Sequence, residues 1–139
     1  IDPGKKGALA VLDSDEMVVN CIDMQDTTAA LHEWIAGLPI VKLAVLEKPM
    51  IGMVAGPRQI ATTFENYGVL RGAVQWRDMP FVEVSPAKWK SALDLTKQDK
   101  AASRQRASQL LPDQADLFKR VKDDGRAEAV LLAWWGSRK

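Results

Sequence analysis

The sequence predicts an α/β fold in which helices flank one mixed sheet of five strands. Two observations support this prediction: the chain opens with three short β-like segments joined by short turns, and helical and β-like segments alternate after them. Short connections favour antiparallel pairing, whereas a helix between two strands favours a parallel crossover. With 139 residues the chain has the size of one domain, so we expect a single domain over residues 1–139.

The first three predicted strands form an antiparallel meander. The first ends at Asp2 and is followed by a turn rich in Pro, Gly and Lys at residues 3–7; the second is the apolar run Ala8–Leu12. A polar turn at residues 13–16 leads to the third, residues 17–22, which is apolar and β-branched. Because the chain starts inside the first predicted strand, we expect its natural N-terminus to be truncated.

Helices and strands are predicted to alternate in the rest of the chain. The two further strands are the nearly continuous apolar run 41–47 and residues Phe81–Val84. The predicted helices cover residues 29–37, 58–76, 87–95, 97–111 and 123–135. A helix followed by a buried strand is typical of a right-handed parallel crossover. Three antiparallel strands followed by such crossovers is the element order of the ribonuclease H-like fold, an analogy at the level of the fold alone.

Composition limits the kinds of site that the chain can build. Hydrophobic residues make up 47% and charged residues 27% of the chain, as in ordinary globular proteins, and no apolar run approaches membrane-spanning length. We therefore expect a cytoplasmic protein without a membrane partner. Cys21 is the only cysteine and His32 the only histidine, which excludes an internal disulfide, a cysteine zinc cage and a multi-histidine metal site.

Charge is distributed unevenly along the chain. Residues 1–47 carry eight acids and three lysines, whereas residues 48–139 carry ten acids and sixteen basic residues. This split predicts a basic surface built by the second part of the chain. Such a surface suits a polyanionic partner, and the alternative is an ordinary solvated surface of mixed charge.

Four acids are predicted to meet at one site. Asp2 and Glu47 end two strands that should be parallel neighbours, and Asp124 and Glu128 are four apart, on one face of the last helix. Carboxylates without His or Cys suit Mg²⁺ or Mn²⁺, and two such ions about 3.5–4 Å apart would support hydrolysis of a phosphodiester. Three of these acids also have a simpler interpretation: Asp2 as the start of a turn, Glu47 as a strand-end charge, and Asp124 with Asp123 as a helix N-cap pair.

Several motifs of the chain resemble those of the RuvC-type Holliday-junction resolvases. Ile1-Asp2-Pro3-Gly4…Gly7-Ala8 is similar to the opening strand of that family, and Leu46-Glu47-Lys48-Pro49 to its second catalytic strand. Asn66-Tyr67-Gly68…Leu70-Arg71-Gly72 resembles the helix that follows. The segments Val84-Ser85-Pro86-Ala87-Lys88-Trp89-Lys90 and Lys122-Asp123-Asp124-Gly125-Arg126-Ala127-Glu128-Ala129 are most similar to the phage branch and to the related chloroplast resolvases.

The resemblance implies a metal-dependent endonuclease that acts as a homodimer and nicks two opposed strands of a four-way DNA junction. It maps the catalytic and metal-binding acids onto Asp2, Glu47, Asp124 and Glu128, with two Mg²⁺ ions (or Mn²⁺) per site. The chain departs from the family at one position. Bacterial resolvases carry an acid or a histidine three residues before the last acid, where this chain has Gly125. We therefore assign the third ligand to Asp124, and Asp123 is the less favoured choice.

Basic and apolar side chains near these acids are candidates for DNA contact. We expect Lys88 and Lys90 to contact phosphates, and Lys122 to lie near the phosphate that is cut. The same basic stretch continues through Lys97, Lys100 and Arg104. Trp89 favours core packing, with base stacking as the alternative. Met50 belongs to an unusually apolar loop at residues 48–57, which predicts either a wedge between base steps or a dimer contact.

The helix predicted at residues 58–76 is the candidate dimer interface. Gly68 and Gly72 are four apart within it, which predicts that another backbone approaches closely there. Two alternatives to a junction resolvase remain at the level of sequence: a catalytically silent nucleic-acid-binding module of this fold, and a nuclease acting on RNA or linear DNA. The motifs favour a bacterial or phage-infected host, and an organelle remains the alternative source.

Overall fold

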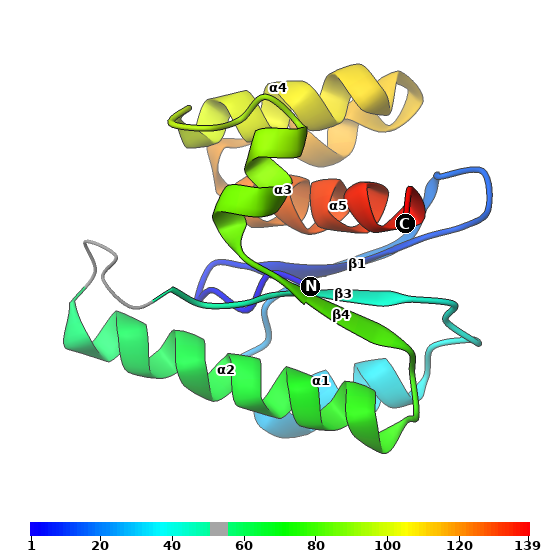
Figure 1. Ribbon diagram of the computed structural model, residues 1–139, viewed down its shortest axis with the longest axis vertical. Coiled ribbons are helices and arrows are strands. Elements are labelled where there is room, and N and C mark those ends of the chain that lie inside the picture. The colour runs from blue at the N-terminus through cyan, green and yellow to red at the C-terminus, as the bar shows by residue number, and fades with distance from the viewer. Residues whose placement is uncertain (51–55) are drawn as a thin grey trace.

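The computed structural model describes residues 1–50 and 56–139 of this α/β protein (Figure 1). Its strands are β1 (Ala8–Leu12), β2 (Val18–Asp23), β3 (Ala44–Glu47) and β4 (Phe81–Val84). Its α-helices are α1 (Thr28–Ala36), α2 (Pro57–Trp76), α3 (Pro86–Ala92), α4 (Lys100–Leu110) and α5 (Asp124–Ser137), and two 3₁₀ turns, η1 (Pro112–Phe118) and η2 (Val121–Asp123), join α4 to α5. None of the described helices is long and apolar enough to cross a membrane.

The prediction of a five-stranded mixed sheet in a ribonuclease H-like fold is wrong. The described residues form two small sheets, an antiparallel pair of β1 with β2 and a parallel pair of β3 with β4. The segment predicted as the first strand contributes only an isolated bridge between Asp2 and Ala8. Pro3 follows directly, and because proline has no N–H for a strand ladder, the pairing does not continue past Asp2.

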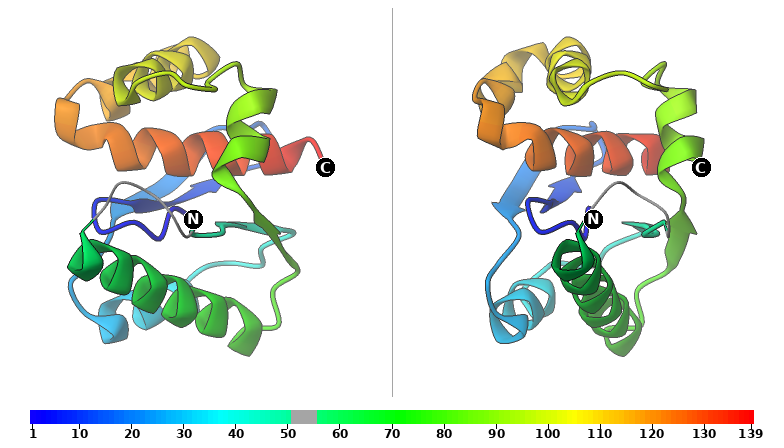
Figure 2. Two further views of the ribbon diagram at one scale, coloured as in Figure 1. Left: turned by 60° about the vertical axis from the view of Figure 1, so that its left-hand side comes forward. Right: turned by 90° about the vertical axis from the view of Figure 1, so that its left-hand side faces the viewer.

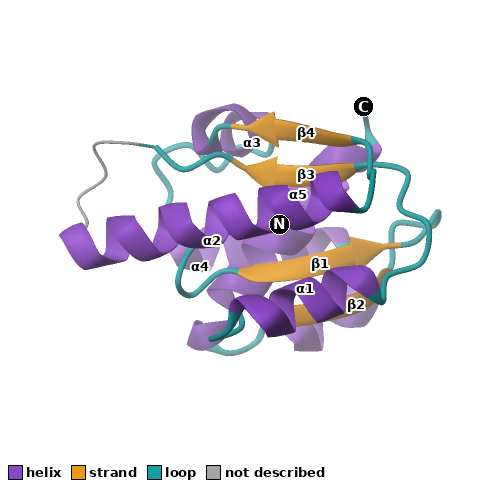
Figure 3. Cartoon of the chain, turned by 90° about the horizontal axis from the view of Figure 1, so that it is seen from below, coloured by secondary structure: helices purple, strands orange, loops and turns teal. Residues whose placement is uncertain are grey.

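Backbone hydrogen bonds of these first two residues nevertheless connect the two sheets. The Ile1 amino group donates to the Val45 carbonyl at 2.8 Å, and the Glu47 N–H donates to the Ile1 carbonyl at 3.0 Å. On the other side, the Asp2 N–H donates to the Ala8 carbonyl at 3.0 Å. Figure 3 shows β3 and β4 pointing the same way and β1 the opposite way. Asp2 is thereby placed beside the end of β3, which carries Glu47.

Helices cover both faces of the strands (Figures 1 and 2). On one side, α1 and α2 pack against a core that includes Leu9 of β1 and Leu46 of β3. On the other side, α3, α4 and α5 enclose a core that includes Val45 of β3, Val84 of β4 and Trp89. Side chains that alternate along a strand point to opposite faces, so neighbouring residues of β3 enter different cores.

Two glycines let α5 pack closely against the rest of the fold. A Cβ at Gly125 would overlap the Lys6 carbonyl, and one at Gly136 would overlap the side chain of Val45. The glycines of α2 behave differently, because no described atom lies within 4 Å of a Cβ built at Gly68 or Gly72. The close backbone approach predicted at this pair is therefore not made within the described part of the chain.

Candidate functional site

Three of the four predicted acids line one cavity of about 780 Å³, called here the main cavity. They are Asp2, Glu47 and Glu128, which come from the chain start, the end of β3 and the second turn of α5. The residues that line the other walls are Pro3, Gly4, Lys5, Lys6, Gly7, Pro49, Met50, Arg58, Gln59, Ile60, Thr62, Thr63, Phe64, Pro86, Lys90, Lys100 and Gly125. The cavity thus combines carboxylates with basic side chains from four segments of the chain.

Local structure holds each of these carboxylates by one oxygen. The Gly4 N–H donates to Asp2 Oδ1 at 2.9 Å, and the Trp89 Nε1–H donates to Glu47 Oε2 at 2.6 Å. Glu128 Oε1 accepts from Lys90 Nζ at 2.7 Å and from the Ser103 hydroxyl at 3.3 Å. The second oxygen of each carboxylate accepts no hydrogen bond from the described residues. Three oxygens from three elements are therefore available to a ligand of the cavity.

Burial and the charges of neighbouring carboxylates disfavour the ionised forms of Asp2 and Glu47. The pKa of Glu47 is raised to about 7, mainly by burial and next by the Asp2 carboxylate, although the Trp89 hydrogen bond opposes the shift. The pKa of Asp2 is also raised, by burial and then by the Glu128 carboxylate, against the Gly4 N–H. Carboxylates with these properties gain most from a partner of opposite charge inside the cavity.

The donor set fits a hard divalent cation, although the side chains are not gathered into a finished cage. Carboxylate oxygens without nitrogen or sulfur are the ligands that Mg²⁺ and Mn²⁺ prefer. Among the described residues, no group of three or more His, Cys, Asp or Glu side chains is arranged to hold a metal ion. Repulsion separates bare carboxylates, and the Lys90 ammonium neutralises Glu128 directly. Asp2, Glu47 and Glu128 each have one carboxylate oxygen that accepts no hydrogen bond from the described residues, and these three residues would hold a cation.

Asp124, the fourth predicted acid, lies outside the main cavity. It lines a second cavity of about 510 Å³, which shares Lys5, Lys6, Gly7 and Lys100 with the main cavity. Its Oδ1 lies 2.8 Å from Arg104 Nε, and each side chain is 19% exposed. The two atoms form an ion pair, but both lack a hydrogen bond of good geometry. Arg104 thus neutralises Asp124 as long as the two side chains keep this arrangement.

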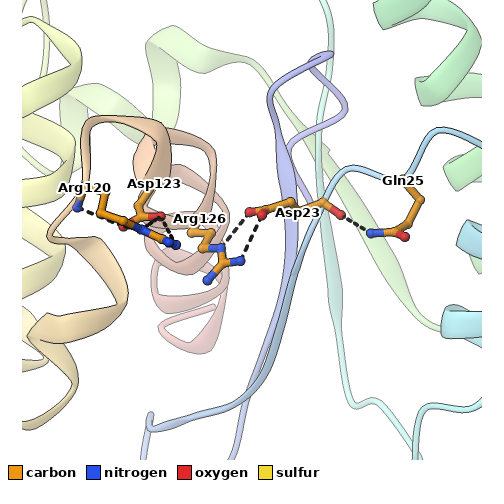
Figure 4. Close-up of polar contacts among 5 residues, drawn as sticks. All are labelled: Asp23, Gln25, Arg120, Asp123 and Arg126. Atoms are coloured by element: carbon orange, nitrogen blue, oxygen red, sulfur yellow. Dashed lines mark hydrogen bonds and ion pairs between the residues drawn. The ribbon is translucent and has the colours of Figure 1, made fainter.

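Asp123 has a structural role at the start of α5. It is 1% exposed, and its carboxylate accepts from the Arg120 backbone N–H at 2.9 Å and from the Arg120 guanidinium (Figure 4). These hydrogen bonds lower the pKa of Asp123. The neighbouring Arg126 makes a bidentate pair with Asp23 at the end of β2, at 2.6 and 2.8 Å. This network fixes the start of α5 against the sheet and leaves Asp123 no free ligand oxygen directed to the main cavity.

Gly125 explains why the chain lacks a carboxylate three residues before Glu128. Any side chain at this position would collide with the backbone of Lys6 and Gly7. The close approach of α5 to the turn instead brings Glu128 into the main cavity with Asp2. A ligand in the position found in bacterial resolvases is therefore sterically excluded here.

The predicted DNA-binding residues divide into three groups: those that line one of the two cavities, one that is paired with an acid, and those that line neither cavity. Lys90, Lys100 and Met50 line the main cavity, and Lys122 lines the second cavity together with Lys100. Arg104 is engaged with Asp124. Lys88 and Lys97 are exposed but line neither cavity. The rest of the loop prediction, at residues 51–55, lies outside the described residues.

Sequence reasoning missed the connection between α3 and two of the acids. Trp89 is fully buried, as its predicted packing role requires, yet its indole also holds Glu47. The next residue, Lys90, holds Glu128. One short helix therefore fixes carboxylates from β3 and from α5. The sequence shows that Trp89 and Lys90 are adjacent and therefore lie on the same short helix. It does not show which acids they hold, because these partners depend on long-range packing.

Comparison with known proteins leaves the chemistry of these cavities to be argued from the residues themselves. No protein-family model matches the chain. No curated protein matches it either. The function is accordingly inferred from the three carboxylates, from the basic residues around them and from the motifs that carry them.

Proposed function

We propose that the chain is a divalent-metal-dependent endonuclease that resolves four-way DNA junctions by paired, symmetric nicks. The observation that carries the proposal is the convergence of Asp2, Glu47 and Glu128 on one cavity, each with an oxygen that accepts no hydrogen bond from the described residues. Carboxylates whose pKa is raised by burial and by a neighbouring acid, as at Asp2 and Glu47, cluster at functional sites. Their setting among basic side chains suits a phosphodiester substrate.

The roles of the residues follow from their positions. Asp2, Glu47 and Glu128 would hold Mg²⁺ or Mn²⁺, which when bound supplies an activated water and stabilises the leaving oxygen of the phosphodiester. Lys90 and Lys100 line the same cavity and offer ammonium groups to phosphate oxygens. Trp89 orients Glu47 through the indole N–H, and Ser103 orients Glu128. Asp124 joins this set only when Arg104 releases it.

Selectivity for junctions and the homodimer rest on the resemblance to RuvC-type resolvases and on the exposed face of α2. Gly68 and Gly72 face open space, and Phe64 and Trp76 are 38% and 71% exposed on the same helix. A two-fold dimer formed through α2 would offer two sites to the two opposed strands of a symmetric junction. By the same resemblance, the chain is proposed to act in the cytoplasm of a bacterial or phage-infected cell.

The decisive experiment separates binding from cleavage. Asp2→Asn and Glu128→Gln keep the shape of each side chain and remove its charge, so cleavage of a synthetic four-way junction in Mg²⁺ should be lost. Binding of the same junction in EDTA should persist. Asp15→Asn, in the exposed turn between β1 and β2, is the matched control and should cut like the unaltered chain. Undiminished cleavage by both site variants would refute the proposal.

A second candidate function is a nucleic-acid-binding module without nuclease activity. It is favoured by one specific observation: Lys90 and Arg104 already neutralise Glu128 and Asp124 without any metal ion. This candidate predicts junction binding with no strand cleavage in either Mg²⁺ or Mn²⁺. A linear duplex of the same sequence, assayed beside the junction, would reveal a nuclease without junction selectivity.

A further inference from the structure

The second cavity is a basic recess beside the predicted nuclease site. It is lined by Lys5, Lys6, Gly7, Asp23, Met24, Lys100, Val121, Lys122 and Asp124, and its volume is about 510 Å³. Four lysines from three separate segments surround it: the turn at residues 3–7, the start of α4 and η2. Lysines drawn together from distant parts of a chain repel one another unless an anion lies between them.

The acids of the second cavity do not neutralise these lysines. Asp23 is bound by Arg126 through two hydrogen bonds of 2.6 and 2.8 Å, and Asp124 is paired with Arg104 at 2.8 Å. None of the four lysines makes an ion pair with the described residues. The recess therefore carries positive charge that the described part of the chain leaves uncompensated, which suits an anionic ligand.

The two cavities adjoin along the turn at residues 3–7. Lys5, Lys6, Gly7 and Lys100 line both of them. A polyanion whose reacting group reaches Asp2 and Glu128 in the main cavity can therefore continue over the turn into the second cavity. Repeating anionic groups at fixed spacing along one chain are the property of a nucleic-acid backbone.

We propose that the second cavity is a subsite for a phosphate of the bound DNA strand that flanks the phosphodiester to be cut. Lys5, Lys6, Lys100 and Lys122 hold that phosphate, and Arg104 and Arg126 keep the cavity's own carboxylates neutralised. This subsite deepens the nuclease function proposed above and rests on it for the identity of the ligand. It assigns to Lys5 and Lys6 a role in substrate binding, and it places Lys122 at a flanking phosphate rather than at the scissile one.

The test is the salt dependence of binding to a fluorescent four-way junction in EDTA, where no cutting occurs. The slope of log K against log salt concentration is negative, and each lost contact with a duplex phosphate lowers its magnitude by about 0.9. Lys5→Gln and Lys122→Gln should each lower the magnitude of the slope by this amount, and the double variant by about twice as much. Lys42→Gln removes the same charge just before β3, at the end of the strand opposite Glu47, and should leave the slope unchanged.

The outcomes distinguish the subsite from the nuclease proposal. If Lys5→Gln and Lys122→Gln show the same slope as Lys42→Gln, the subsite is refuted, whether or not the protein cuts DNA. If the magnitudes of the slopes fall as expected but no metal supports cleavage, the subsite stands and the nuclease proposal fails. If the unaltered chain binds no DNA, both are refuted. Circular dichroism spectra that match the unaltered chain establish that each variant is folded.

Discussion

Replacing Trp89 with phenylalanine tests whether the hydrogen bond of the indole sets the properties of Glu47. Trp89 is 0% exposed, and its indole N–H, the only polar hydrogen of the side chain, donates to Glu47 Oε2 at 2.6 Å. Phenylalanine keeps an aromatic ring in this core and removes the donor. Because a hydrogen bond to a charged group contributes about 1.5–3 kcal/mol, its loss should favour the neutral form of Glu47 strongly.

The size of the expected effect follows from the link between free energy and pKa. Burial and the Asp2 carboxylate raise the pKa of Glu47 to about 7, while the Trp89 donor lowers it. If the whole hydrogen bond acts on the ionised form, its loss raises this pKa further by about 1–2 units, since one unit corresponds to about 1.4 kcal/mol. Only the ionised carboxylate binds a metal ion, so the protein needs a higher pH to load the same amount of metal.

Two assays measure this displacement. The pH–rate profile of junction cleavage at limiting Mg²⁺ should move to higher pH by about 1–2 units in Trp89→Phe. Carbon-13 NMR titration of the glutamate carboxyl groups in EDTA gives the pKa of Glu47 without requiring any activity. Trp76→Phe is the matched control for the titration, because Trp76 is 71% exposed at the end of α2 and its replacement should leave the pKa of Glu47 unchanged.

The reasoning would be refuted by an unchanged Glu47 titration in folded Trp89→Phe. Such a result would mean that the indole fills space without stabilising the carboxylate. A lower melting temperature with an unchanged titration has the same meaning, because loss of ring volume in a packed core destabilises the protein without affecting the charge of Glu47.

Two further predictions concern stability. Gly125→Ala should lower the free energy of unfolding by about 1–3 kcal/mol or more, because the added Cβ overlaps the Lys6 carbonyl. Gly68→Ala, in open space on α2, should raise the free energy of unfolding by about 0.4–1 kcal/mol. Urea denaturation measures both, and equal effects of the two substitutions would contradict the packing of α5. The ordinary pKa of Glu47 is 4.5, and its pKa in the folded protein is about 7. Between these two pH values the folded state binds one more proton than the unfolded state. In EDTA, the unaltered chain should therefore lose stability relative to Glu47→Gln as the pH rises from 4.5 to about 7. A difference between these two proteins that stays constant from pH 4 to 8 would argue against the raised pKa.

The sequence predicted the secondary structure well because its signals are local. Ala8–Leu12 and Phe81–Val84 have the predicted bounds, and the helix predicted at 58–76 is α2 from Pro57. Alternation of apolar residues and the positions of proline and glycine are sufficient for such assignments. The prediction of one continuous sheet was wrong because each strand of such a sheet needs several paired residues. The segment before Pro3 provides one isolated bridge, at Asp2.

The candidate site was predictable to the extent that strand ends determine it. Asp2 and Glu47 lie together because Ile1 hydrogen-bonds to Val45 and Glu47 of β3, in the pattern of parallel neighbours. The partners of the acids were not predictable, because they come from residues far along the chain. Trp89 reaches Glu47 across 42 positions, and Arg104 was predicted to contact DNA but pairs with Asp124. Sequence spacing indicates which face a residue occupies, but not which charge will lie opposite it.

Gly125 accounts for both the convergence and the separation of the acids on α5. Asp124 and Glu128 are four residues apart, so they lie one turn above the other on one side of the helix. Between them, the turn at residues 3–7 closely approaches the helix at Gly125, and Lys5, Lys6 and Gly7 of this turn line both cavities. Glu128 therefore faces Asp2 and Glu47, while Asp124 faces the lysines of the second cavity and its partner Arg104. A contact that brings helix and turn together thus places Asp2, Glu47 and Glu128 in the main cavity and Asp124 in the second cavity.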